Sequence, residues 1–168
     1  PVTDGKTIYA SFLEVGSKKV SAPNVGSKRK ITPGRMVVAA YDASGKKLWA
    51  VRPGDFVSAH GFCSSPVIYE DLPNVNGDHD GKSYMLALDR ASGKTVWKTG
   101  RKYGIRSYVT PLIRKIDGRT QMVVSGSQHI TSFNPRTGKP YWIIEGPTEQ
   151  FVASMVYDGN LFFMACGY

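Results

Sequence analysis

Short apolar and aromatic runs alternate with polar, glycine-containing turns along most of the chain, which is the pattern of many short β-strands. Four segments read as a strand, a tight turn and a second strand: residues 1–12, 66–76, 111–124 and 155–165. Three of them carry Asp-Gly at the turn: Asp4-Gly5, Asp117-Gly118 and Asp158-Gly159. Glycine accepts the positive φ that a two-residue turn requires, so these segments predict β-hairpins.

A second pattern recurs after three of these hairpins. It is seen in AAYDASGKKLW (39–49), ALDRASGKTVW (87–97) and SFNPRTGKPYW (132–142). Each segment has Gly followed by Lys, and Trp four places after the Gly. The pairs are Gly45/Trp49, Gly93/Trp97 and Gly138/Trp142. The tryptophans stand 48 and 45 residues apart, close to the ~40–50 residues of a four-stranded propeller blade.

Each unit therefore combines two hairpins into four antiparallel strands, with the Trp on the outermost strand. We expect this Trp to wedge between neighbouring blades, because a small residue on the third strand leaves room for it. The small residues are Ala39, Ala87 and Ser132. Asp89 and Asn134 are expected to accept hydrogen bonds from turn amides. The first unit has Tyr41 at that place, followed by Asp42, so its turn is expected to be built differently.

The sequence predicts an all-β fold, a β-propeller segment of about three and a half four-stranded antiparallel blades. The blade units are expected at about 1–53, 54–100, 101–147 and 148–168, and the first contains an insertion at 15–34. Propellers usually close about four to eight blades into a ring. An arc with two open flanks invites association, so we expect either a piece of a larger propeller or a chain that pairs with another copy.

The pattern A-x-D-x-x-[ST]-G-K-x-x-W resembles the pyrroloquinoline-quinone (PQQ) type repeat of quinoprotein alcohol dehydrogenases. It also resembles that of their cofactor-free relatives, such as the periplasmic propeller lipoprotein of outer-membrane protein assembly. Residues 87–97 match it best, 132–142 match it more loosely, and 39–49 lack the aligned Asp. The resemblance covers nearly the whole chain outside 15–34 and implies the fold rather than an activity.

For the dehydrogenases, the resemblance implies a quinone held above a tryptophan and beneath a vicinal disulfide, with a calcium or lanthanide ion and an aspartate base. This chain has no adjacent cysteine pair, and its three tryptophans all belong to the repeat. No catalytic or cofactor-binding residue is carried over, so the chain is placed closer to the cofactor-free members. No cofactor is expected here; PQQ and calcium are expected only where a full-length parent completes their site.

Composition agrees with a globular protein, since 41% of the residues are apolar and 21% are charged. The net charge of +9 is spread out except in one patch within 16–35: Lys18, Lys19, Lys28, Arg29, Lys30 and Arg35. The patch lacks the interleaved aromatics of a base-stacking surface, which disfavours nucleic acid. A solvated loop is the favoured interpretation, with an acidic partner or a membrane surface as the alternatives. No apolar run has the length of a membrane helix, and the N-terminus lacks a signal-peptide pattern.

The most chemically suggestive segment is NVNGDHDG at 74–81. Asn76, Asp78 and Asp80, followed by Gly81, fit the opening of a calcium loop, where alternate oxygen ligands point inward. The twelfth position, Ala87, cannot supply the closing ligand. The alternative is a solvated loop between the second and third strands of a blade.

Cysteine and histidine spacings indicate no metal site. Cys63 and Cys166 are 103 residues apart in apolar surroundings, where buried free thiols are the expected outcome. His60, His79 and His129 show no metal-ligand spacing, so each is expected to be exposed or hydrogen-bonded inside the fold.

These features predict a non-catalytic propeller segment, periplasmic or secreted, that binds or scaffolds a protein or polymer partner. The chain carries the structural repeat residues and no surplus chemistry, which favours this function over an enzyme. One alternative is a fragment of a PQQ-dependent alcohol or sugar dehydrogenase. A second is a designed or trimmed half-propeller that self-associates through its open edges.

Overall fold

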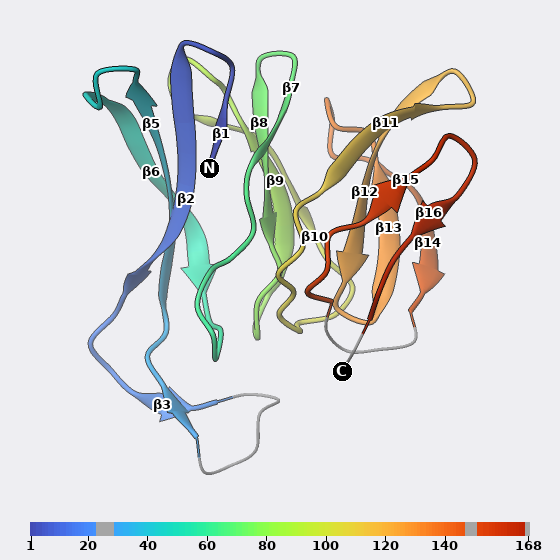
Figure 1. Cartoon of the computed structure of the whole chain (residues 1–168). Coiled ribbons are helices and arrows are strands. Elements are labelled where there is room, and N and C mark those ends of the chain that lie inside the picture. Colours follow the sequence, from blue (N-terminus) through green and yellow to red (C-terminus); the bar gives the residue numbers. More distant parts are fainter. Residues whose placement is uncertain (23–28, 147–150, 167–168) are drawn as a thin grey trace.

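The computed structural model describes residues 1–22, 29–146 and 151–166, and within these ranges the chain consists of strands, turns and loops without a helix. Three four-stranded sheets stand side by side as propeller blades (Figure 1). Every strand pairing is antiparallel. The predicted fold class, an all-β propeller segment of four-stranded blades, is confirmed. None of the described residues forms a helix long and apolar enough to cross a bilayer.

Each blade uses four strands in chain order. Blade 1 contains β1 (Val2–Thr3), β2 (Thr7–Val15), β5 (Gly34–Asp42) and β6 (Lys47–Phe56). Blade 2 contains β7 (Val67–Tyr69), β8 (Leu72–Gly77), β9 (Tyr84–Leu88) and β10 (Thr95–Gly100). Blade 3 contains β11 (Leu112–Ile116), β12 (Arg119–Gly126), β13 (His129–Phe133) and β14 (Pro140–Glu145). The hairpin of β15 (Val156–Tyr157) and β16 (Phe162–Phe163) follows blade 3.

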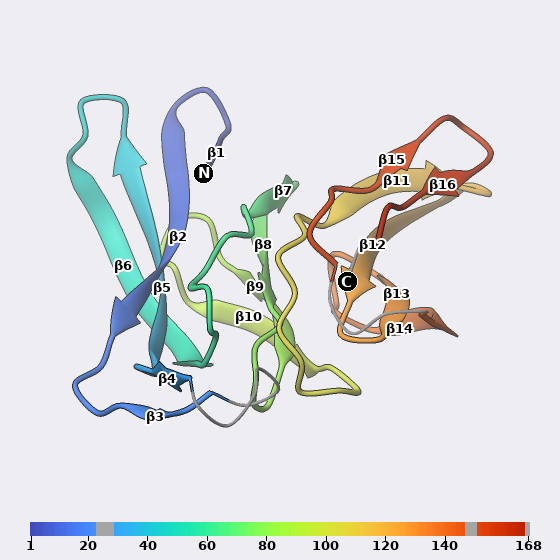
Figure 2. The ribbon, with the colours of Figure 1, turned by 60° about the horizontal axis from the view of Figure 1, so that its bottom comes forward.

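The insertion of blade 1 is a hairpin rather than an irregular loop. It contains β3 (Val20–Ser21) and β4 (Lys30–Ile31), which form a two-stranded sheet of their own. Lys28, part of the predicted basic patch, lies outside the described residues. In Figure 1 this hairpin lies below the lower ends of the blades. Figure 2 shows it beside the same ends of blades 1 and 2.

The core lies between the blades, because the middle strands are covered on both faces. Met36 and Val38 of β5 pack with Val75, Leu86 and Leu88 of blade 2. A second cluster joins blades 2 and 3, and a third joins blade 3 to the β15–β16 hairpin. All five residues of β9 are buried, which explains why its sequence is a continuous apolar run instead of an alternating one.

The repeated tryptophans connect one blade to the next. The indole Nε1 of Trp49 donates to the carbonyl of Arg90 at 3.0 Å, and that of Trp97 donates to the carbonyl of Pro135 at 3.2 Å. Both carbonyls belong to the outer turn of the following blade. Trp142 instead donates to Oε1 of Gln121 within its own blade, at 2.9 Å.

The repeated glycines receive these indole rings. A Cβ atom built on Gly93 would lie 2.7 Å from the ring of Trp49, and one on Gly138 would lie 2.3 Å from the ring of Trp97. Both glycines also have positive φ, +73° and +70°. Glycine is therefore required twice over at these turns, for backbone conformation and for the approach of the ring.

A short acidic or amide side chain holds each outer turn. Oδ1 of Asp89 accepts the backbone N–H of Ser92, and Oδ1 of Asn134 accepts those of Arg136 and Thr137. In blade 1 the same role belongs to Asp42, which accepts from the amides of Ser44 and Lys46.

The turn of blade 1 is one residue shorter, because Gly45 follows its capping residue by three places rather than four. The shorter turn shifts the strand register. Trp49 stands opposite Ala40, not Ala39, whereas Trp97 stands opposite Ala87 and Trp142 opposite Ser132.

Candidate functional site

The polar segment after β8 lies at the lower ends of the blades in Figure 1, where it meets the 101–110 connection to blade 3. Asp78 forms an ion pair with Arg101 in which both side chains are fully buried. Nε of Arg101 donates to Oδ1 of Asp78 at 2.8 Å, and Nη2 donates to Oδ2 at 3.1 Å. The hydroxyl of Ser107 also donates to Oδ2, at 2.7 Å. Nη2 of Arg101 continues to the carbonyl of Gly126, so this ion pair ties blade 2 to blade 3.

A second buried ion pair lies beside the first. Nη1 of Arg106 donates to both carboxylate oxygens of Asp80 at 3.0 Å. The backbone N–H of Asp80 donates to the carbonyl of Val57 at 2.7 Å, which adds a contact with blade 1. Nδ2 of Asn76 donates to the hydroxyl of Ser107 and to a backbone carbonyl. We call Asn76, Asp78, Asp80, Arg101, Arg106 and Ser107 the interblade clamp.

The clamp changes how the predicted calcium residues are understood. Asn76, Asp78 and Asp80 are between 1% and 6% exposed, so the segment is not the solvated loop considered as the alternative. Each carboxylate already faces a guanidinium group. The described residues contain no group of three or more His, Cys, Asp or Glu side chains placed to share a metal ion. Calcium binding at Asn76, Asp78 and Asp80 stays a prediction.

His79 lies between the two aspartates and is held by backbone groups. Its Nδ1 accepts the N–H of Val57 at 3.2 Å, which leaves Nε2 as the protonated nitrogen that donates to the carbonyl of Lys82 at 3.1 Å. The ring stacks on Phe56 with the centroids 5.4 Å apart. Burial lowers the pKa of His79 below its usual 6.5, although the nearby Asp55, Asp78 and Asp80 carboxylates act in the opposite direction.

This histidine predicts acid sensitivity. The pKa of His79 is lower in the folded state than in the unfolded chain, where it is about 6.5. The contribution of His79 to stability is therefore complete above about pH 6.5, and it is lost as the pH falls towards the lower pKa of the folded state. One such group changes the free energy of unfolding by at most about 1.4 kcal/mol per pH unit. His79→Gln is expected to flatten the fall of stability below pH 6.5, measured by urea denaturation at several pH values.

His60→Gln is the matched control, since His60 is exposed. His129 is also buried, and burial lowers its pKa, so some pH dependence should persist in His79→Gln. Equal slopes for wild type and His79→Gln would contradict the prediction.

A groove next to the clamp extends from the lower end of blade 1 to the border with blade 2, and only its part at that border is lined by residues of both blades. It consists of two pockets of about 620 and 580 Å³ that share Asp55 and Val57. Lys82, Lys98 and Gly100 line the larger one, and Glu14 and Arg35 line the smaller one.

Polar contacts order the groove wall. Nζ of Lys98 donates to the carbonyl of Pro53 at 2.8 Å and lies 3.8 Å from the ring centre of Tyr84. The hydroxyl of Tyr84 donates to the carbonyl of Asp55 at 3.2 Å. Burial lowers the pKa of Lys98 and raises that of Tyr84. The wall is therefore a fixed surface with positive charge at its rim.

The serine and histidine of the groove are not arranged as a nucleophile and base. The hydroxyl of Ser83 donates to the backbone carbonyl of His79 at 2.8 Å and accepts the backbone N–H of the same residue at 3.0 Å. Both ring nitrogens of His79 bond to other backbone groups. General-base activation of a hydroxyl needs the two side chains bonded to each other. These groups hold the loop instead.

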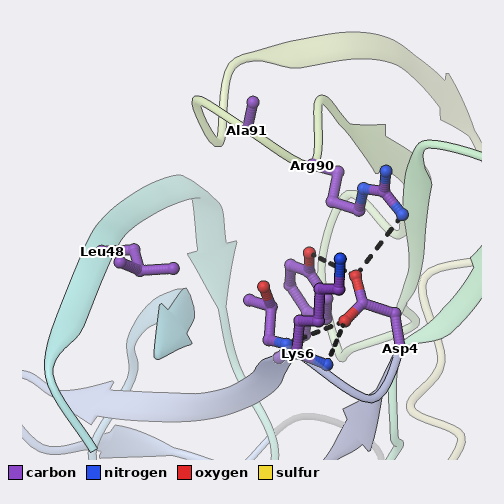
Figure 3. A pocket seen from close by; sticks show the side chains of 7 residues that line it. Asp4, Lys6, Leu48, Arg90 and Ala91 are labelled. Carbon is purple, nitrogen blue, oxygen red and sulfur yellow. Dashed lines mark hydrogen bonds and ion pairs between the residues drawn. The ribbon is translucent and has the colours of Figure 1, made fainter. Parts of the chain in front are cut away.

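A third pocket, of about 380 Å³, lies at the opposite end of the blades (Figure 3). Asp4 accepts the backbone N–H groups of Lys6 and Thr7 at 2.9 and 2.8 Å, and these bonds, the one from Thr7 foremost, lower the pKa of its carboxyl group. Arg90, from the outer turn of blade 2, reaches Asp4 at 3.4 Å. Asp4 and Arg90 thus pair with each other across blades 1 and 2.

Two further expectations concern the cysteines and the remaining histidine. Cys63 and Cys166 are free, but both are exposed, so the expectation of buried thiols is wrong. His129 is buried, and its Nδ1 bonds to the backbone carbonyl of Ser127.

Sequence reasoning missed the partners of the acidic segment. Arg101 and Arg106 lie in the connection RKYGIR between two blades, where isolated arginines look like surface residues. The sequence did contain one signal, a set of opposite charges that could pair. Two arginines follow two aspartates by 23 and 26 residues within one blade and its exit connection.

The family model PQQ_2, described as outer membrane protein assembly factor BamB, matches residues 3–162. The structure of BamB from Moraxella catarrhalis has a TM-score of 0.58 and 20% sequence identity, covering 86% of this chain and 45% of that one.

Two other solved structures are similar over a smaller share of their length. A europium-containing methanol dehydrogenase has a TM-score of 0.49 and 18% identity, covering 83% of this chain and 27% of that one. Quinohemoprotein alcohol dehydrogenase from Comamonas testosteroni has a TM-score of 0.46 and 22% identity, with 83% and 23% covered. No curated protein gives a significant match. The chain spans less than half the length of each of these structures.

Proposed function

Because the chain belongs to the PQQ_2 family, described as outer membrane protein assembly factor BamB, we propose that it is a non-catalytic module that binds and scaffolds a protein partner. The groove that extends from blade 1 to the border with blade 2 is the proposed contact surface. A periplasmic or secreted location is part of the same proposal.

One observation carries the non-catalytic part of the proposal: the acidic, histidine and serine side chains of the 78–83 segment are already bonded within the fold. Asp78 and Asp80 pair with arginines, and His79 and Ser83 bond to backbone groups. Groups that act in general acid–base catalysis need access to the substrate proton. In this fold the same groups fix loops that shape the groove.

The groove suits a protein segment better than a small ligand. Its two pockets together form an open trough bordered by Lys82, Lys98 and Arg35, with Asp55 shared in the middle. Small-molecule sites are enclosed and mostly apolar, whereas protein contact surfaces combine a shaped centre with a polar rim. The rigid wall made by Tyr84 and Lys98 gives a partner a preformed surface.

Filling the groove should block the partner. Gly100 lines the larger pocket, and a Cβ atom there would meet nothing within 4 Å, so Gly100→Trp places a large ring in the groove with little strain. We expect a photo-crosslinking residue at Lys82 to give discrete protein adducts in the native host. Gly100→Trp should reduce the adduct yield at least about tenfold, the effect of losing one central contact.

Ala91→Trp is the control, because Ala91 lines the pocket at the opposite end of the blades (Figure 3). Equal adduct yields for Gly100→Trp and Ala91→Trp would contradict the groove as the contact surface. Turnover of an alcohol or sugar, followed by dye reduction after PQQ and Ca²⁺ are added to the full-length parent, would contradict the non-catalytic function.

A further inference from the structure

The hairpin inserted in blade 1 carries uncompensated positive charge. We call residues 16–22 and 29–33 the basic hairpin; its cations are Lys18, Lys19, Arg29 and Lys30, all of them exposed. The sequence from 15 to 34 contains no Asp or Glu. None of the ion pairs among the described residues involves any of these four side chains. Arg29 and Lys30 do form hydrogen bonds, but their acceptors are neutral oxygens.

The base of the hairpin is held in one geometry. The N–H of Gly16 donates to the carbonyl of Pro33 at 2.8 Å, and Val20 stands opposite Ile31 in the β3–β4 pair. Ile31 is only 7% exposed, so the hairpin has a buried apolar side. Nη2 of Arg29 donates to the carbonyl of Ala59 at 3.0 Å, which fastens the hairpin to the connection after β6.

The hairpin is also the part of the protein that stands furthest out on its face. Figure 1 shows it below the lower ends of the blades. In Figure 2 it lies beside the ends of blades 1 and 2. A flat surface that approached this face would meet the hairpin before the groove or the clamp.

Three of the four cations are lysines, and Lys18 and Lys19 form no side-chain hydrogen bond within the described residues, which indicates the kind of partner. Arg29 is committed to a carbonyl of the fold, and Arg35 at the hairpin base pairs with Glu14 at 3.4 Å. Specific recognition of protein carboxylates favours arginine held in a fixed bidentate geometry. Lysine acts as a hydrated point charge on a flexible stem, which suits a diffuse anionic surface. We propose that the basic hairpin docks the protein onto an anionic lipid membrane.

This inference goes beyond the proposed partner-binding function and is independent of it. Lysines near an anionic bilayer each contribute about 1 kcal/mol of attraction, and the attraction falls off within a Debye length. Few apolar side chains accompany the lysines, so the contact should be peripheral and reversible by salt. The groove opens at the same end of the blades, and Gly16 and Pro33 at the base of the hairpin line its smaller pocket, so docking would place the groove close to the membrane.

The test uses vesicles and two triple variants of equal charge. Lys18→Gln, Lys19→Gln and Lys30→Gln together neutralise the hairpin and leave Arg29 in place. The control combines Lys46→Gln, Lys94→Gln and Lys139→Gln, at exposed positions on the outer turns at the opposite end of the blades. Sedimentation with vesicles of phosphatidylglycerol and phosphatidylcholine should show roughly hundredfold weaker binding for the hairpin variant.

The control variant should keep most of the wild-type binding, and vesicles of phosphatidylcholine alone should bind neither protein. Binding should also vanish at about 1 M salt, where the Debye length is about 3 Å. Equal losses in the two variants would overturn the proposal, because they would indicate a general effect of net charge. The proposal would also be overturned if the wild type did not bind anionic vesicles. Loss of crosslinks to an acidic protein in the hairpin variant would then indicate a protein partner instead. Thermal unfolding of both variants checks that exposed Gln residues leave the fold intact.

Discussion

Replacing Arg101 by Met is expected to lower the free energy of unfolding by about 3–5 kcal/mol, the range for a buried ion pair that loses one member. The reason is the environment of the remaining charge. Asp78 is fully buried, and of the hydrogen bonds that its carboxylate accepts from Arg101 and Ser107, only the one from the Ser107 hydroxyl would remain without Arg101. A carboxylate isolated from water in this way is costly even when the guanidinium stem is replaced by a side chain of similar length. Denaturation of the chain in urea measures the loss.

The next residue in the chain provides a matched control. Lys102 also forms an ion pair, with Glu145, but about half of each side chain is exposed. Lys102→Met should therefore cost at most about 1 kcal/mol. Adding Asp78→Asn to Arg101→Met removes the stranded charge and should recover part of the lost stability, as a double-mutant cycle would show. A cost for Arg101→Met no larger than that for Lys102→Met would contradict the clamp.

The blades were predictable from the sequence because their determinants are local. A hairpin needs a turn with the right φ and flanking strands, and Asp117-Gly118 has positive φ at both residues, as such a turn requires. The Gly-Lys-x-x-Trp pattern reflects a contact between blades, which is not local. The pattern was still visible in the sequence because it recurs once in each blade. Even the irregular turn of blade 1 is visible in the shift from Tyr41 to Asp42.

The clamp and the groove could not be derived in that way, because both depend on how blades meet. Asp78 and Arg101 belong to a loop and a connection whose proximity follows from sheet packing rather than from spacing. The pattern of Asn76, Asp78 and Asp80 looks like a cation site when read alone. In the fold, two buried arginines of the same chain serve as the counter-ions of the two aspartates. Cys63 shows the opposite error: its apolar neighbours in sequence suggested burial, but the side chain is exposed.

Gly138→Ala is the second substitution with a large expected effect, because it combines two separate penalties. The left-handed backbone conformation costs an alanine about 1–2 kcal/mol. The new Cβ atom would also lie 2.3 Å from the indole of Trp97, and such overpacking typically costs about 1–3 kcal/mol. The total expected loss is about 2–5 kcal/mol. The ring cannot retreat freely, since its Nε1 is bonded to the carbonyl of Pro135.

The first blade separates the two penalties. Gly45 occupies the same place in its turn with a φ of +85°, but a Cβ atom there would meet nothing within 4 Å. Gly45→Ala should therefore show the backbone cost alone, about 1–2 kcal/mol in urea denaturation. Trp97→Ala should itself cost about 3–5 kcal/mol. In the background of Trp97→Ala combined with Thr99→Ala, the additional cost of Gly138→Ala should fall to the value found for Gly45→Ala, because the Thr99 hydroxyl is the other side-chain atom close to the new Cβ atom, at 2.7 Å. If Gly45→Ala and Gly138→Ala cost the same in the wild-type background, the indole contact adds nothing at the turn. A larger cost at Gly138 would instead show that Gly138 is required by the tryptophan of the preceding blade as well as by its own turn.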